Sequence, residues 1–155
     1  MAVLALAAVL VADAAPESIE GRLSAGDYSG ALTALASVPA QYRDTRWHLL
    51  ASKAEDGLND PAKAVAEAQQ AVDLDPASEP ARLQLAQIFL SRNPPEAAYE
   101  ILSEAVPLFP DSALMRLGIG LALNQMRRYA EAIPVLENRL KLRPDLSLTR
   151  WPPPC

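Results

Sequence analysis

The sequence predicts an all-α fold built from repeated pairs of helices, and three observations support this prediction. First, the motif Leu-x-Pro occurs three times at a constant spacing of 34 residues, ending at Pro76, Pro110 and Pro144. Second, half of the residues are apolar but only 5% are aromatic, and the abundance of Ala and Leu favours helices. Third, small and basic residues recur in phase with the prolines: Ala64, Ala98 and Ala132, and Arg82, Arg116 and Arg150.

The helices of the first half can be placed from their start and stop signals. Pro16 suits the first turn of a helix over 16–25, which Gly26 and Asp27 end before a second helix runs from Tyr28 toward Pro39. These two helices form a degenerate first repeat, about 16–40. The second repeat, about 45–76, contains helices near 45–58 and 61–74, because Pro61 suits the first position of a helix.

The second half repeats the same plan. The third and fourth repeats span about 79–110 and 113–144, and small residues such as Ala98 and Gly120 predict close approach of neighbouring helices. Residues 145–155 begin a fifth repeat that stops at three consecutive prolines, so we expect an aborted repeat with a Pro-rich tail. The chain therefore has the character of an interrupted piece of a longer array.

The N-terminal segment, residues 1–14, has two open interpretations. Residues 2–12 are an uncharged apolar run followed by Ala12-Asp13-Ala14, which is typical of a secretory signal peptide, although no Lys or Arg precedes the run. The alternative is an apolar helix that packs on the first repeat. The first interpretation predicts export to the periplasm or the extracellular space of a bacterium, and the second a cytoplasmic protein. We expect no membrane contact beyond this segment.

Composition excludes several classes of function. The net charge of −5 and the pI near 4.9 argue against nucleic acid as a partner. Cys155 is the one cysteine and His48 the one histidine, which removes cysteine-ligated metal sites and multi-histidine catalytic sites. We expect His48 to pack partly against Trp47, and carboxylates such as Asp73 and Asp75 to be solvated. The sequence therefore predicts no catalytic residue, no metal and no cofactor, and the chain is not expected to be an enzyme.

The period of 34, the small residue in each second helix and the closing proline resemble the tetratricopeptide repeat. The residues of the third and fourth repeats that match the family pattern are Leu85, Ala86, Phe89, Ala98, Leu102 and Ala105, and Ile119, Gly120, Leu123, Tyr129, Ala132 and Leu136. The second repeat departs from the pattern, because Glu55 and Ala68 stand where the family usually has aromatic side chains. The resemblance implies an α-solenoid of about four helix-turn-helix units over 16–144.

The resemblance also implies a groove lined by the first helices of successive repeats, which holds an extended peptide or a partner helix. The groove residues it assigns are Arg46, Leu49, Lys53 and Asp56; Leu83, Gln87, Leu90 and Ser91; and Leu117, Leu121, Asn124 and Gln125. Leucines 49, 83 and 117 replace the first lysine of the clamp with which some relatives bind chaperone C-termini. The remaining stripe suits an amphipathic or apolar segment, unless these leucines only pack within the array.

Together these observations predict a non-catalytic interaction scaffold that binds another protein or a peptide. Two alternatives stay open: a docking or regulatory segment of a larger protein, including an enzyme, and a self-associating assembly subunit. Self-association through the C-terminal repeat is expected because the last helix carries Ile133, Leu136 and Leu140 with no capping helix after it.

Overall fold

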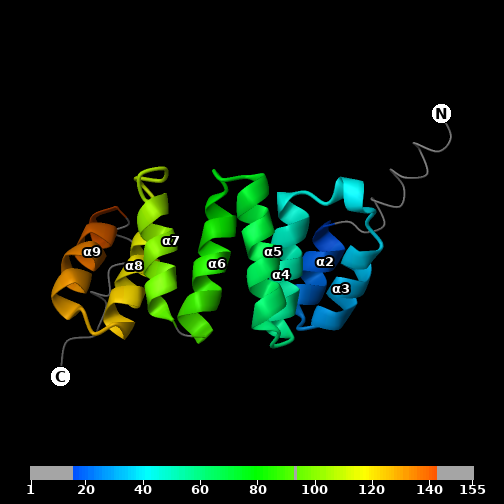
Figure 1. Cartoon of the computed structure of the whole chain (residues 1–155), viewed down its shortest axis with the longest axis horizontal. Helices are drawn as coiled ribbons and strands as arrows, with labels where there is room; N and C mark the ends of the chain where they lie inside the picture. Colours follow the sequence, from blue (N-terminus) through cyan, green and yellow to red (C-terminus); the bar gives the residue numbers. More distant parts are fainter. Residues whose placement is uncertain (1–15, 93, 143–155) are drawn as a thin grey trace, which may run out of the picture. The chain divides into compact units, whose positions relative to one another are not determined.

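The computed structural model describes residues 16–92 and 94–142, and every regular element within these residues is helical. The α-helices are α2 (Pro16–Ser24), α3 (Tyr28–Ala36), α4 (Thr45–Gly57), α5 (Pro61–Leu74), α6 (Glu79–Arg92), α7 (Pro95–Ala105), α8 (Ala113–Gln125) and α9 (Tyr129–Leu142), with a short 3-10 helix η1 (Ala40–Tyr42) (Figure 1). The predicted all-α fold of helix pairs is confirmed. The predicted signal peptide, residues 1–14, and the predicted tail, 145–155, lie outside the described residues.

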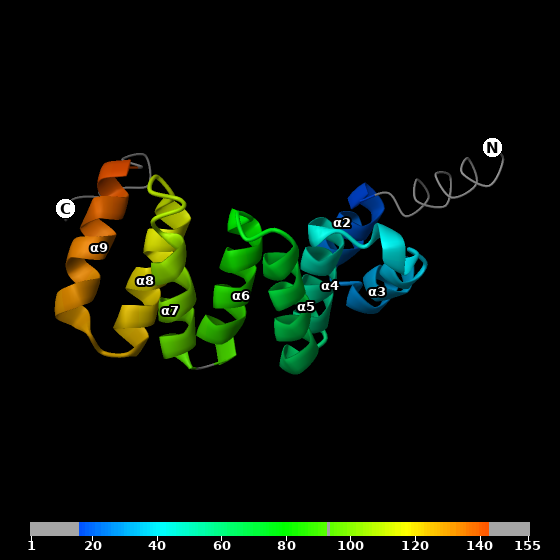
Figure 2. The same ribbon diagram turned by 45° about the horizontal axis from the view of Figure 1, so that its top comes forward.

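The chain divides into two compact units, the first ending at Ile88 within α6 and the second beginning at Phe89. In the first unit α4 packs against both α3 and α5, and α2 packs against α3 and α4 (Figure 2). The core that these helices share consists of Ile19, Ala31, Leu35, Leu50, Ala51 and Ala54. Three of these six residues are alanines, and their small side chains allow the helix axes to approach closely.

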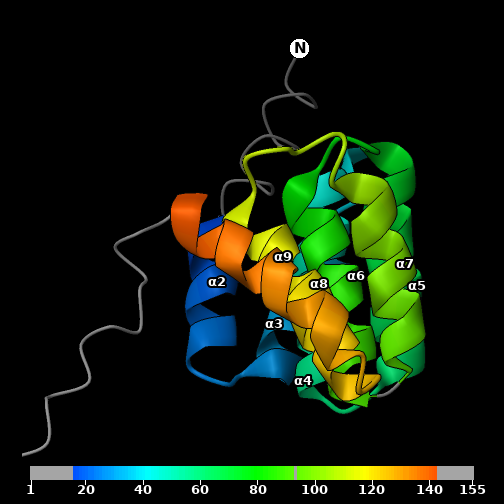
Figure 3. The same ribbon diagram turned by 90° about the vertical axis from the view of Figure 1, so that its left-hand side faces the viewer.

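In the second unit α8 packs against α7 and α9, and α9 crosses α8 obliquely (Figure 3). The expected packing face of α7 is confirmed, because Ala98, Leu102 and Ala105 are all fully buried. Side chains of α7 and α9 pack on the glycines of α8: Leu102 lies against Gly118, and Leu136 lies against Gly120. Leu136 therefore packs within the repeat, whereas Ile133 on the same helix is 57% exposed.

The turn between the two helices of a repeat has the same backbone geometry wherever it is described. Gly26, Asn59 and Arg127 all have positive φ angles of 77°, 66° and 60°. In each case the next residue donates its N–H to a carbonyl five positions earlier, at 2.8, 2.9 and 2.8 Å. This is the Schellman arrangement, which satisfies carbonyls at the end of the first helix. The repeat period is thus visible in the backbone conformation as well as in the sequence.

Side-chain caps start the helices at the expected positions. Asp44 accepts the N–H of Trp47 at 2.8 Å, and Asp60 accepts the N–H of Lys63 at 3.2 Å, just before Pro61 opens α5. Hydrogen bonds from the Lys63 side chain and then from its backbone hold the pKa of the Asp60 carboxyl below its ordinary value. The caps explain why the predicted starts of α4 and α5 coincide with the observed ones.

Candidate binding groove

The four groove residues assigned to the second repeat all lie on α4, and none is buried. Arg46 and Lys53 are exposed, whereas Leu49 and Asp56 are half-buried. Residues spaced three to four positions apart lie along one side of a helix, so this set forms a stripe rather than a ring around α4. Such a stripe can contact a ligand while the rest of α4 packs in the core.

A hollow of about 430 Å³ lies next to this stripe and is hereafter called the groove hollow. Its lining comes from three helices: Glu20, Leu23 and Ser24 of α2, Tyr28 of α3, and Leu50 and Lys53 of α4. The first helices of the first and second repeats therefore line this hollow together, and Lys53 is a predicted groove residue that takes part in the lining. The residues of α2 and Tyr28 were not predicted as groove residues, because the first repeat matches the family pattern too poorly for an alignment to assign them.

The rim of the groove hollow is charged on both helices. The Arg46 guanidinium lies 2.9 Å from the Glu20 carboxylate, which links α4 to α2 through two half-exposed side chains. An exposed pair of this kind contributes about 0–1 kcal/mol, so a ligand can compete for either partner. Lys53 forms no ion pair with any residue that the structure describes. The hollow thus combines an apolar floor of Leu23 and Leu50 with an available cation.

The tyrosine of this surface packs closely against a glycine. A methyl group on Gly57, at the end of α4, would lie 2.4 to 2.5 Å from the ring of Tyr28. The ring therefore occupies the space that any larger residue at position 57 would require. The absence of a side chain at position 57 therefore lets the Tyr28 ring pack against the end of α4 at the edge of the groove hollow.

The remaining predicted groove residues fall into the two units. In the first unit, Leu83 is half-buried and Gln87 is exposed on α6. In the second unit, the Gln125 side chain donates to the carbonyl of Leu90 at 3.2 Å, which brings two of the predicted residues together at the end of α6. Ser91 and Asn124 are exposed in the same unit.

A row of leucines runs along α8 in the second unit. Leu117 is half-buried and Leu121 is 45% exposed, and both were predicted as groove residues. Leu114, which is 57% exposed, extends the same row and was missed. Its position, three residues before Leu117 and seven before Leu121, is the signal that could have identified it.

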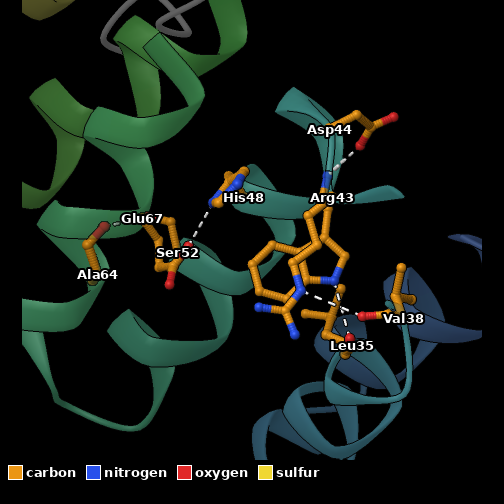
Figure 4. Close-up of polar contacts among 9 residues, drawn as sticks. Leu35, Val38, Arg43, Asp44, His48, Ser52, Ala64 and Glu67 are labelled. Carbon is orange, nitrogen blue, oxygen red and sulfur yellow. Dashed lines mark hydrogen bonds and ion pairs between the residues drawn. The ribbon is translucent and has the colours of Figure 1, made fainter. Parts of the chain in front are cut away.

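A network of polar contacts surrounds α4 on the side of Trp47 (Figure 4). The expected packing of His48 on Trp47 is confirmed, since the two rings meet edge to face with centroids 4.9 Å apart. The sequence did not reveal that His48 Nδ1 lies 2.8 Å from a carboxylate oxygen of Glu67, or that the buried Ser52 hydroxyl donates to the Ala64 carbonyl at 2.8 Å. Both contacts join α4 to α5 within the second repeat.

The described residues contain no group of three His, Cys, Asp or Glu side chains that could hold a metal ion. Nor does any helix within 16–92 or 94–142 have the length and apolar character needed to span a membrane. The groove hollow itself is lined by the apolar side chains of Leu23 and Leu50, with the charged side chains of Glu20 and Lys53 beside them.

Residues 57–118 match the sequence model of the tetratricopeptide repeat. The fold is similar to that of MamA (22% identity, 83% of this chain and 75% of that chain covered, TM-score 0.71) and of YrrB, described as a TPR protein with an unusual peptide-binding site (16% identity, 86% and 72% covered, TM-score 0.71). It is also similar to pilF of Pseudomonas aeruginosa (22% identity, 82% and 59% covered, TM-score 0.74). No curated protein sequence matches this chain.

Proposed function

We propose that this chain is a tetratricopeptide repeat protein, since residues 57–118 match the model of that family, and that it is a non-catalytic scaffold which binds an extended peptide or a helix of another protein. The observation that carries this proposal is the groove hollow, which the first helices of two successive repeats line together. Its volume of about 430 Å³ lies within the range of small-ligand pockets, so one or two side chains of a bound segment fit into it.

The chemistry of the hollow indicates what kind of segment it takes. Leu23 and Leu50 offer apolar contact, and Lys53 and Ser24 offer polar contact at the edge. A segment with an apolar side chain next to an acidic or carbonyl group would use both. The exposed leucines of α8 offer a second apolar surface in the other unit, which suits an amphipathic partner.

Selection of peptides from a random phage-displayed library on the immobilised full chain tests the proposal. The selected peptides should bind Lys53→Gln and Ser24→Trp more weakly than the wild type by about ten-fold or more, because the first variant removes the cation and the second fills the hollow. Both positions are exposed, so the fold should be kept, which circular dichroism verifies.

Gln70→Glu is the matched control, since it changes the net charge by the same amount as Lys53→Gln at an exposed position on α5. The proposal would be refuted by selected peptides that bind all three variants with the affinity of the wild type. A library that yields no binding peptide at all would count against it as well.

Two finer proposals concern where the protein works and whether it forms oligomers. We propose export, on the basis of the apolar run before Ala12-Asp13-Ala14, and N-terminal sequencing from the native host should then begin at Ala15 or close to it. An intact Met1 would refute export. We also propose self-association through α9, because Tyr129 and Ile133 are 54% and 57% exposed on it.

Self-association is tested by light scattering across a concentration series. Ile133→Glu should lower the apparent mass at high micromolar concentration, whereas a wild-type chain that stays monomeric would refute the proposal. Docking within a larger protein is the remaining alternative, and a longer reading frame around this sequence would support it.

A further inference from the structure

A second hollow in the first unit has no place in the proposed function. It measures about 270 Å³ and is hereafter called the Trp47 hollow. Trp47 and Glu55 of α4 line it together with Leu32 and Leu35 of α3 and Glu67 of α5. Because a helix turns by about 100° per residue, the stripe of Trp47 and Glu55 lies on a different face of α4 from Arg46 and Lys53. The two hollows are therefore separate sites.

The lining of the Trp47 hollow includes a departure from the repeat pattern. Glu55 stands 34 residues before Phe89, and Phe89 stands 34 before Leu123, so the equivalent positions of the next two repeats carry large apolar side chains. Leu123 is almost completely buried at 2% exposure. Glutamate at this position leaves unfilled the space that an aromatic ring would occupy, yet only 14% of the Glu55 side chain is exposed.

The Glu55 carboxylate has few partners for so enclosed a charge. The cation nearest to it is Lys63, at 4.0 Å, and this exposed lysine lies closer to Asp60, at 3.0 Å. Within the described residues the Glu55 side chain forms no other ion pair and no hydrogen bond. Carboxylates removed from water are normally paired and hydrogen-bonded, because leaving them unpaired is costly. Glu55 therefore has unused capacity to accept hydrogen bonds on the side of the hollow.

We propose that the Trp47 hollow binds a basic side chain, lysine or arginine, of a partner polypeptide. The aliphatic stem would lie along Leu32, Leu35 and the indole, and the charged head would reach the carboxylates of Glu55 and Glu67. This order of apolar stem and charged end matches the lining of the hollow from α3 to α5.

Arg43 shows that the indole of Trp47 accepts a cation. Its guanidinium carbon lies 4.5 Å from the centroid of the ring, and its Nε donates to the carbonyl of Val38 at 3.3 Å (Figure 4). Arg43 is thus anchored to the backbone just after α3 and forms part of the lining of the hollow. The Arg43 guanidinium already lies over the indole, so the charged head of an incoming side chain is attracted instead to the carboxylates of Glu55 and Glu67 in the same lining.

Titration of the ¹⁵N-labelled full chain with Nα-acetyl-lysine amide and Nα-acetyl-arginine amide tests the proposal. The chain has two tryptophans, and the signal of Trp47 is the indole N–H peak that is missing in Trp47→Phe. This N–H donates to the Leu35 carbonyl at 3.0 Å at the wall of the hollow, so its chemical shift reports on occupancy. Both cationic probes should shift the peak saturably. Nα-acetyl-norleucine amide, which has the stem without the charge, should bind at least about ten-fold more weakly.

Variants then assign the binding to Glu55. Glu55→Gln should lower the affinity for the cationic probes by at least about ten-fold, whereas Glu104→Gln, the same change at an exposed position of α7, should leave it unchanged. Lys53→Gln should also leave it unchanged, which separates this site from the groove hollow. If Glu55→Gln proved unfolded by circular dichroism, Glu55→Phe would take its place and should abolish the saturable shift.

Three results would overturn the proposal. They are a shift that grows linearly without saturation, equal affinity for the norleucine probe, and wild-type affinity in Glu55→Gln. The second result would show a merely apolar cavity, and the third would show attraction to the acidic surface in general.

Discussion

Glu55→Phe should stabilise the protein, because it restores the aromatic residue that the third repeat carries as Phe89. A buried phenylalanine removes about 150–250 Å² from water. If about 100 Å² of the ring enters the hollow of about 270 Å³, burial at about 25 cal/mol per Å² contributes about 2.5 kcal/mol. Ordering the ring costs about 0.5–1 kcal/mol, which leaves a gain of about 2 kcal/mol in the free energy of unfolding.

The charge that Glu55→Phe removes subtracts little from this gain. Lys63 lies 4.0 Å from Glu55 but keeps its ion pair with Asp60 at 3.0 Å. Thermal unfolding followed by circular dichroism should therefore show a Tm higher by about 4–8 °C for a chain of this size. Glu104→Phe, at an exposed position, is the control and should give no such rise. A Tm of Glu55→Phe at or below that of the wild type would refute the argument that Glu55 leaves an unfilled space.

Three further predictions concern packing and capping. Ala98→Trp should lower the free energy of unfolding by several kcal/mol, on the order of 3 or more, because Ala98 is fully buried. A Tm equal to that of Ala130→Trp, the control at an exposed position, would contradict this. Leu102→Ala should lower the free energy of unfolding, measured in urea, by about 2–5 kcal/mol, since the fully buried Leu102 fills the space beside Gly118. A loss below about 1 kcal/mol would contradict the close packing of α7 on α8. The pKa of the Asp60 carboxyl in the folded state lies below its ordinary value of 3.8, so its contribution to stability is present above that value and is lost as the pH falls through the folded pKa. Asp60→Asn should therefore be less stable than the wild type at pH 7 but not at about pH 2. An equal difference in stability at both pH values would refute this origin.

The first residues of α2, α3, α4 and α5 could be predicted from the sequence because their causes are local, whereas α3 ends at Ala36, before the predicted stop at Pro39. Asp60 and Pro61 determine where α5 begins through a cap and a fixed φ angle, and Gly26 ends α2 because it tolerates a positive φ. The burial of Ala98 and Leu102 followed from the repeat period, since equivalent positions of stacked helix pairs face the same neighbours. These features depend on residues a few positions apart, or on a spacing of 34 that the sequence displays directly.

The sites could not be predicted to the same extent, because they depend on side chains that are far apart in the chain. Glu20 lies 26 residues before Arg46, and His48 lies 19 residues before Glu67, and no local pattern signals that either pair will meet. The substitution of Glu55 for an aromatic residue was visible in the sequence, but the resulting hollow also depends on the distances of α3 and α5 from α4. The sequence by itself determined the repeat and its helices, whereas the tertiary structure alone decided which charges meet and where space is left between helices, because these follow from the packing of whole helices and not from the conformation of any one of them.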